Sequence, residues 1–160
     1  MTGTGGDPVS RRVPDVCRVT ASAAAPLRAA VLRPGLGVAA VSEADDDAPH
    51  TLFLAVLGPG GRVLSTVNVR PRRPPWDPDE AGWWQLRGMA TAESARRRGH
   101  AGRLLLAALE HVDDAHGQVW CNARTGALEL YARSGFGPVG EPWTHPERGP
   151  HQTMARPAQL

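Results

Sequence analysis

The chain has 160 residues, of which 41% are hydrophobic and 21% are charged, and its formal net charge is +2. This length suits one ordinary domain, and no apolar run approaches the roughly 20 residues that cross a membrane. The small net charge gives no reason to expect a nucleic-acid or membrane partner. Because all 18 basic residues are arginines, Schiff-base chemistry and a phosphate-loop lysine are also excluded.

The first 14 residues mix glycine, proline and charge without periodicity, so we predict a flexible leader at 1–14 and a single domain at 15–160. No apolar stretch of the kind found in a secretory signal follows the start, which makes the cytoplasm the expected location. Residues 16–20 then favour a short strand. Residues 21–32 favour an alanine-rich helix that Pro34 and Gly35 end.

Two β-rich runs, at residues 51–57 and 62–69, are separated by a Gly-Pro-Gly-Gly turn and predict an antiparallel hairpin. Before them, the acidic run at residues 45–47 is typical of a solvated loop, and we assign it no chemistry. Residues 70–82 carry four prolines and are expected to form a loop. Residues 83–91 predict a strand, in which Gly88 indicates a bulge or a close backbone approach.

A long amphipathic helix is predicted after this strand, because apolar residues recur at helical spacing from Ala101 to Val112. The remaining predicted elements are a strand at 118–122, a helix at 127–134, strands at 136–140 and 151–155, and a loop at 142–150. Cys17 and Cys121 are isolated, so neither a metal site nor a redox pair is indicated. We expect Cys121, inside an apolar run, to be a core thiol.

The turn between the strand at 83–91 and the long helix combines three consecutive arginines with Gly99 and Gly102. The start of a helix presents unpaired backbone N–H groups and the positive end of its dipole, which together bind phosphate. Glycines let the backbone approach such a ligand closely, and arginines add charge-assisted hydrogen bonds. The turn is therefore a candidate phosphate-binding site.

The spacing Arg96-x-x-Gly99-x-Ala101 resembles the coenzyme A pyrophosphate loop of the GNAT acetyltransferase superfamily. Residues 86–91 look like that family's fourth strand, and residues 120–136 look like its fifth strand and the helix after it. The resemblance implies an α/β fold with a mixed, mostly antiparallel sheet flanked by helices. It also implies acetyl-CoA as acetyl donor, without a metal, and an amine of a small molecule or peptide as acceptor.

Carried over residue by residue, the resemblance assigns roles around the acetyl donor. Backbone groups of Met89, Ala90 and Thr91 would pair with the pantetheine arm, and an N–H, that of Ala90, would polarise the thioester carbonyl. The diphosphate would be held by the turn formed by Arg96, Arg97, Arg98, Gly99, His100, Ala101 and Gly102. Asn122 would lie beside the pantetheine. Tyr131 would protonate the leaving thiolate after direct attack by the amine, although as the only tyrosine it also suits a role in the core.

The general base is less well indicated, because Gln85 and Arg87 stand where many family members place a glutamate. Glu93, His145 and His151 are candidates, and we favour His151 because a histidine titrates near neutral pH. Arg87 is expected to bind a carboxylate of the acceptor.

Alternatives to an acetyltransferase are a non-catalytic coenzyme A sensor, suggested by the missing strand glutamate, and a nucleic-acid binder that uses the arginine run. The flanking strand, helix and glycines favour the coenzyme A interpretation over the nucleic-acid one. The acceptor is left open, and so is the oligomeric state, with a homodimer among the candidates.

Overall fold

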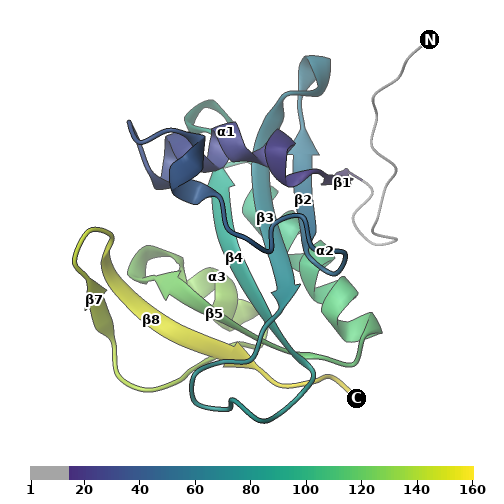
Figure 1. Cartoon of the computed structure of the whole chain (residues 1–160), viewed down its shortest axis with the longest axis vertical. Helices are drawn as coiled ribbons and strands as arrows, with labels where there is room; N and C mark the ends of the chain where they lie inside the picture. Colours follow the sequence, from purple (N-terminus) through teal and green to yellow (C-terminus); the bar gives the residue numbers. More distant parts are fainter. Residues whose placement is uncertain (1–14) are drawn as a thin grey trace. The chain divides into compact units, whose positions relative to one another are not determined.

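A computed structural model describes residues 15–160 of the chain (Figure 1). The predicted leader at 1–14 lies outside the described residues. The chain divides into two compact units: the first comprises Met1–Arg70 and Gly88–His111, and the second comprises Pro71–Arg87 and Val112–Leu160.

The strands follow the order β1-β2-β3-β4-β5-β8-β6, with β7 paired to β8. The β1–β2, β2–β3, β5–β8, β6–β8 and β7–β8 pairs are antiparallel, whereas β4 and β5 are parallel. Three α-helices accompany these strands in the described residues. The predicted α/β fold with a mixed, mostly antiparallel sheet is therefore confirmed.

The first unit begins with a strand, a helix and a hairpin, as predicted. Its elements are β1 (Val16–Val19), α1 (Ala21–Leu32), the short helix η1 (Val38–Val41), β2 (Leu52–Leu57), η2 (Pro59–Gly61) and β3 (Val63–Pro71). The Thr20 hydroxyl caps α1 by accepting a hydrogen bond from the Ala23 N–H at 3.1 Å. β3 extends beyond its predicted end and finishes at Pro71, which has no N–H with which to continue a ladder.

Gly88 lies inside β4 (Trp83–Thr91) with a φ of +67°. A Cβ atom at this position would lie 2.8 Å from Asn68 Nδ2 and 3.0 Å from Arg28 Nε. The position therefore requires glycine for its backbone conformation and for a close side-chain approach, which confirms the expectation from the sequence. β4 is followed by η3 (Glu93–Ala95) and by α2 (His100–Asp114), whose apolar face is buried.

The second unit contains the rest of the chain. Its elements are β5 (Gln118–Arg124), η4 (Thr125–Ala127), α3 (Leu128–Arg133), β6 (Gly137–Pro138), β7 (Trp143–His145) and β8 (Gly149–Arg156). The prediction of a loop at 142–150 is wrong in part, because β7 forms a hairpin with β8 there. The cross-strand pairing of Trp143 with His151 explains the difference, since no local pattern announces so short a strand. No helix of the described residues is long and apolar enough to span a bilayer.

Candidate functional site

The arginine-glycine turn precedes α2 in the first unit and has an unusual backbone. Arg97 has a φ of +64° and Gly99 a φ of +77°, so two of three successive residues are left-handed. The first hydrogen bond of the helix runs from the Arg103 N–H to the Gly99 carbonyl at 3.2 Å. By helix geometry, the N–H groups before Arg103 have no intrahelical acceptor. They are available as donors at the positive end of the dipole of a 15-residue helix.

Space for a ligand is available at this turn. Residues 96–99 are exposed, and a Cβ added at Gly99 or Gly102 would meet no atom within 4 Å. The side of the backbone that a side chain would fill is therefore open at both glycines. An anionic group such as a diphosphate fits the donors, the open glycines and the exposed guanidinium groups together.

The His100 side chain does not join this exposed surface. It is 8% exposed, and its Nδ1 accepts from the Arg103 guanidinium, which places the ring proton on Nε2. Burial lowers the pKa of His100, and the nearby Arg103 and Arg98 charges lower it further. His100 is therefore neutral at pH 7, and only its backbone is suited to contact a ligand.

The end of β4 alternates its backbone groups between two directions. The Ala92 N–H donates to the Leu64 carbonyl of β3 at 2.8 Å, and the Ala90 carbonyl accepts from the Ser65 hydroxyl at 3.2 Å. Because successive residues of a strand point their N–H and C=O groups to opposite edges, Ala90 faces β3. This geometry disfavours Ala90 as the group that polarises a thioester, and it turns the backbone of Met89 and Thr91 toward the other edge.

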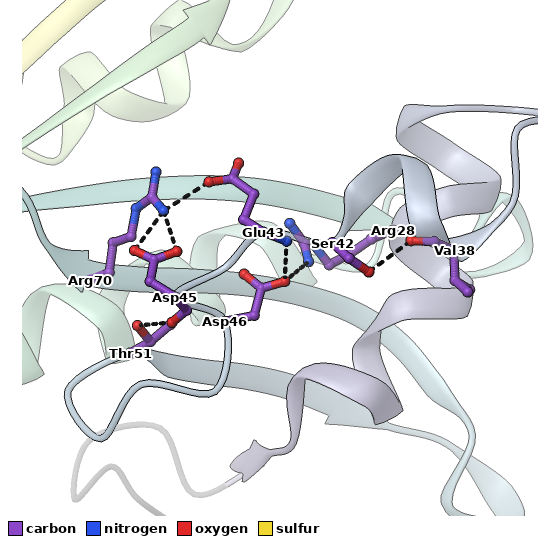
Figure 2. Close-up of polar contacts among 8 residues, drawn as sticks. All are labelled: Arg28, Val38, Ser42, Glu43, Asp45, Asp46, Thr51 and Arg70. Carbon is purple, nitrogen blue, oxygen red and sulfur yellow. Dashed lines mark hydrogen bonds and ion pairs between the residues drawn. The ribbon is translucent and has the colours of Figure 1, made fainter.

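The acidic loop, residues 43–46, is fastened to the first unit by two buried arginines (Figure 2). Arg70, on β3, contacts Asp45 at 2.6 Å and Glu43 at 2.9 Å. Arg28, on α1, lies 3.8 Å from Asp46 and stacks over the Phe53 ring. Both arginines are 4% exposed.

The expectation that the acidic run at 45–47 is a solvated loop is thus wrong for Asp46, whose side chain is 9% exposed, whereas Asp45 pairs with Arg70 and stays 37% exposed. Asp45 and Asp46 neutralise charges that the fold has removed from water. No signal in the sequence links them to arginines that lie 18 and 25 residues away.

In the second unit, Asn122 lies on β5 directly opposite Thr153 of β8. The Thr153 hydroxyl donates to Asn122 Oδ1 at 2.8 Å and accepts from the Trp143 indole N–H at 3.1 Å. Asn122 is exposed, as its predicted contact with a ligand requires. The strand β7 that supplies Trp143 lies beside β8 (Figure 1).

His151 is a buried residue of β8, in agreement with the strand predicted at 151–155. Its Nδ1 lies 2.8 Å from the Gly149 carbonyl, so Nδ1 carries the proton and Nε2 has a free lone pair. The ring stacks on Trp143, with centroids 4.8 Å apart and an interplanar angle of 18°. The ring centroid of His145 lies 6.3 Å from that of His151. The His145 Nδ1 accepts hydrogen bonds from the backbone N–H groups of Glu147 and Arg148.

Tyr131 lies on α3 and is 5% exposed, with its ring in an edge contact with Phe136. Burial raises the pKa of Tyr131, and the neighbouring Cys121 raises it further, so the phenol keeps its proton at neutral pH. Burial also raises the pKa of the Cys121 thiol to about 12, and with 1% exposure Cys121 is a core residue, as predicted.

The sequence-predicted site residues fall into both units. The first unit contains the end of β4, the arginine-glycine turn and the exposed Glu93, whereas the second contains Arg87, Asn122, Tyr131 and His151. Within the second unit, the β5–β8 ladder brings Asn122 and His151 close together, since Arg124 pairs with His151 and Asn122 with Thr153. Sequence reasoning missed Ser65 and Thr153 because their contacts join distant segments. In the described residues, no group of three or more His, Cys, Asp or Glu side chains is placed to hold a metal ion.

Three comparisons place the chain among known proteins. Residues 27–136 match the model of the acetyltransferase (GNAT) family. The curated "Uncharacterized N-acetyltransferase YitI" of Bacillus subtilis (strain 168) is 33% identical over 130 residues, which cover 80% of this chain and 85% of that protein. Two solved structures share the fold. Escherichia coli ElaA has a TM-score of 0.65 and 18% identity, over 86% of this chain and 92% of that one. An aminoglycoside 6′-N-acetyltransferase complexed with coenzyme A has a TM-score of 0.63 and 12% identity, over 88% of this chain and 95% of that one.

Proposed function

The chain belongs to the acetyltransferase (GNAT) family, and from this premise we propose that it transfers an acetyl group from acetyl-CoA to an amine of a small molecule or peptide. The observation that carries the proposal is the turn before α2. Its two left-handed residues, open glycines and unpaired helix N–H groups suit a diphosphate. A fold relative whose structure contains coenzyme A supports the same ligand.

The first unit would bind the donor through its backbone. N–H groups of residues 97–102 would hold the diphosphate, and the exposed guanidinium groups of residues 96–98 would add charge. At the end of β4, Met89 and Thr91 would pair with the amide groups of the pantetheine arm in the manner of an added strand. Their orientation away from β3 supports this choice over Ala90.

Two residues of the second unit would move protons. As the amine nitrogen bonds to the acetyl carbon and the carbon–sulfur bond breaks, the Tyr131 hydroxyl would give its proton to the sulfur. A phenol that burial keeps protonated is suited to this role. His151 would accept the proton of the amine at Nε2, since its Nδ1–H is engaged with the Gly149 carbonyl. Arg87, on β4, would bind a carboxylate of the acceptor.

A second candidate function is a coenzyme A-binding module without catalysis. It is favoured by one observation, the presence of Gln85 and Arg87 in β4 where many members of the family have a glutamate. The two functions share the donor site and differ in turnover. A panel of amines incubated with protein and acetyl-CoA separates them, because only the enzyme releases thiol in an acceptor-dependent way.

The donor site is tested by Gly99→Glu, which places bulk and negative charge where the diphosphate would lie. We expect calorimetry to show a loss of acetyl-CoA affinity of at least about 100-fold, since a carboxylate would repel the phosphates. Gly60→Glu is the matched control, because Gly60 has a similar φ of +71° and equally open surroundings in the turn between β2 and β3. If both variants bind acetyl-CoA equally well, the assignment of the turn is wrong.

A further inference from the structure

We infer that Thr153 is a positioning residue for donor binding, because it orients the Asn122 amide so that its NH2 group faces outward. The inference rests on the proposed function and deepens it, since it names the group that sets the polarity of a predicted pantetheine contact. Trp143 is the second member of the same arrangement. Neither residue stands out in the sequence, where they lie 31 and 21 residues after Asn122.

The geometry is a chain of hydrogen bonds across three neighbouring strands, β7, β8 and β5. The Trp143 indole nitrogen lies 3.1 Å from the Thr153 hydroxyl oxygen, which in turn lies 2.8 Å from Asn122 Oδ1. The β5–β8 register places Thr153 and Asn122 directly opposite each other. Their side chains therefore meet on one face of the ladder.

The chemistry of the three groups fixes the direction of the chain. An indole N–H only donates, so the Thr153 oxygen must act as the acceptor toward Trp143. The hydroxyl has one proton, which is then free to go to Asn122. An amide oxygen receives it, whereas the reversed amide would leave that proton without an acceptor. Asn122 thus presents Oδ1 to Thr153 and both protons of its NH2 group to the other side.

An outward NH2 group selects the type of ligand atom that it binds. It donates to carbonyl oxygens, which the two amide groups of a pantetheine arm supply, and it offers nothing to a donor N–H. Because Asn122 is exposed, these donors are available. The hydrogen-bond chain gives Asn122 one fixed polarity before the ligand arrives, and this reduces the cost of ordering it on binding.

Trp143 also stacks on His151, the proposed base, at 4.8 Å between ring centroids. One side chain thus supports two candidate site residues in different ways: its ring supports His151, and its N–H orients Asn122 through Thr153. The two effects can be separated, because Trp143→Phe keeps an aromatic ring for stacking but removes the N–H.

The test compares ligands with and without a pantetheine arm. We expect Thr153→Val to weaken coenzyme A binding about fivefold, and to leave the affinity for adenosine 3′,5′-diphosphate unchanged, because that fragment has no pantetheine. Thr153→Ser restores the hydroxyl and should rescue coenzyme A binding to within about twofold. Trp143→Phe should reproduce the effect of Thr153→Val. Thr144→Val, at an exposed position of the same hairpin, is the control.

A double-mutant cycle decides whether Thr153 acts through Asn122. In the Asn122→Ala background, Thr153→Val should have no further effect on coenzyme A affinity. Additive losses would overturn the inference, and so would an equal loss of affinity for the adenosine fragment.

The free protein provides a readout that does not depend on the proposed function. In ¹⁵N NMR spectra, Thr153→Val should shift the Trp143 indole N–H and the Asn122 side-chain amide resonances, whereas Thr144→Val should shift neither. Unmoved resonances would overturn the hydrogen-bond chain itself. If they move as expected but the wild-type protein fails to bind coenzyme A, the proposed function is wrong and the role of Thr153 in donor binding falls with it, while the hydrogen-bond chain stands.

Discussion

Arginine is used in two opposite ways within the first unit. Residues 96–98 lie exposed in the turn before α2, whereas Arg28 and Arg70 are almost completely buried beneath the acidic loop. The exposed group faces solvent beside open glycines. The buried pair is neutralised by Glu43, Asp45 and Asp46.

This difference shows what a guanidinium does in each environment. A buried charge must be matched by an opposite charge, so Arg28 and Arg70 hold the acidic loop in place and contribute to the fold. An exposed guanidinium gains little from surface pairing and keeps its donors available for an anionic ligand. The comparison predicts that the buried arginines affect stability and that the exposed ones affect binding.

The largest effect is expected from Arg28→Met. The substitution leaves the Asp46 carboxylate, 9% exposed, without its arginine, and it should lower the free energy of unfolding by about 3 kcal/mol in urea denaturation. Adding Asp46→Asn should recover part of this loss, because no unmatched carboxylate then remains. A single variant as stable as the wild type would contradict the assigned role.

Gly88→Ala tests the packing around the same arginine. A methyl group here meets Asn68 Nδ2 and Arg28 Nε at 3.0 Å or less and requires a left-handed φ, so we expect a loss of about 2 kcal/mol. Gly60→Ala has the same backbone cost in open space and should lose only about 1 kcal/mol. Equal losses in thermal or urea unfolding would show that the Arg28 and Asn68 side chains yield freely.

For the exposed group, Arg96→Met should weaken acetyl-CoA binding about tenfold and change the stability by less than about 0.5 kcal/mol. The affinity of the variant should also depend less on salt, because one charge contact with the phosphates is lost. Arg62→Met, at an exposed arginine of the β2–β3 turn, serves as the control. A destabilised Arg96→Met protein with normal affinity would reverse the comparison.

The smallest effect is expected from His100, which belongs to the same turn as the exposed arginines but is itself buried. Its pKa is lowered from the ordinary 6.5 by burial and by Arg103 and Arg98, so the unfolded chain binds a proton more readily than the folded one. The contribution of neutral His100 to stability is present above pH 6.5 and is lost as the pH falls below it.

Urea denaturation between pH 5 and 8 measures this effect. As the pH falls from 8 to 5, the wild type should lose more stability than His100→Gln does. The difference should be less than about 1 kcal/mol and should arise on the acidic side of the range. His50→Gln, at an exposed histidine, should keep the acid dependence of the wild type. An identical pH profile for His100→Gln and the wild type would contradict the lowered pKa.

Much of the fold was predictable from local patterns. The bounds of α1 and β4 agree with the predicted ranges, and α2 agrees to within two residues, because periodicity and Pro/Gly punctuation are read over a few neighbouring positions. The arginine-glycine turn was also recognisable, since its residue types, spacing and flanking elements are all contiguous. In contrast, β7 was missed, because three residues acquire strand structure only from the partner strand β8.

The sequence by itself therefore determined the order of the elements other than β7, a close backbone approach or bulge at Gly88, and the family resemblance on which the acetyl-CoA proposal rests. The tertiary structure decided which charges are matched and which side chains are oriented. In the folded chain, the Asp46 side chain lies against Arg28, and the His100 ring contacts Arg103 instead of joining the exposed surface of the turn. Thr153 lies between Trp143 and Asn122. These contacts join residues 10 to 31 positions apart, except for the local pair of His100 and Arg103. Burial and hydrogen-bond partners depend on which segments meet, and local periodicity carries no information about that.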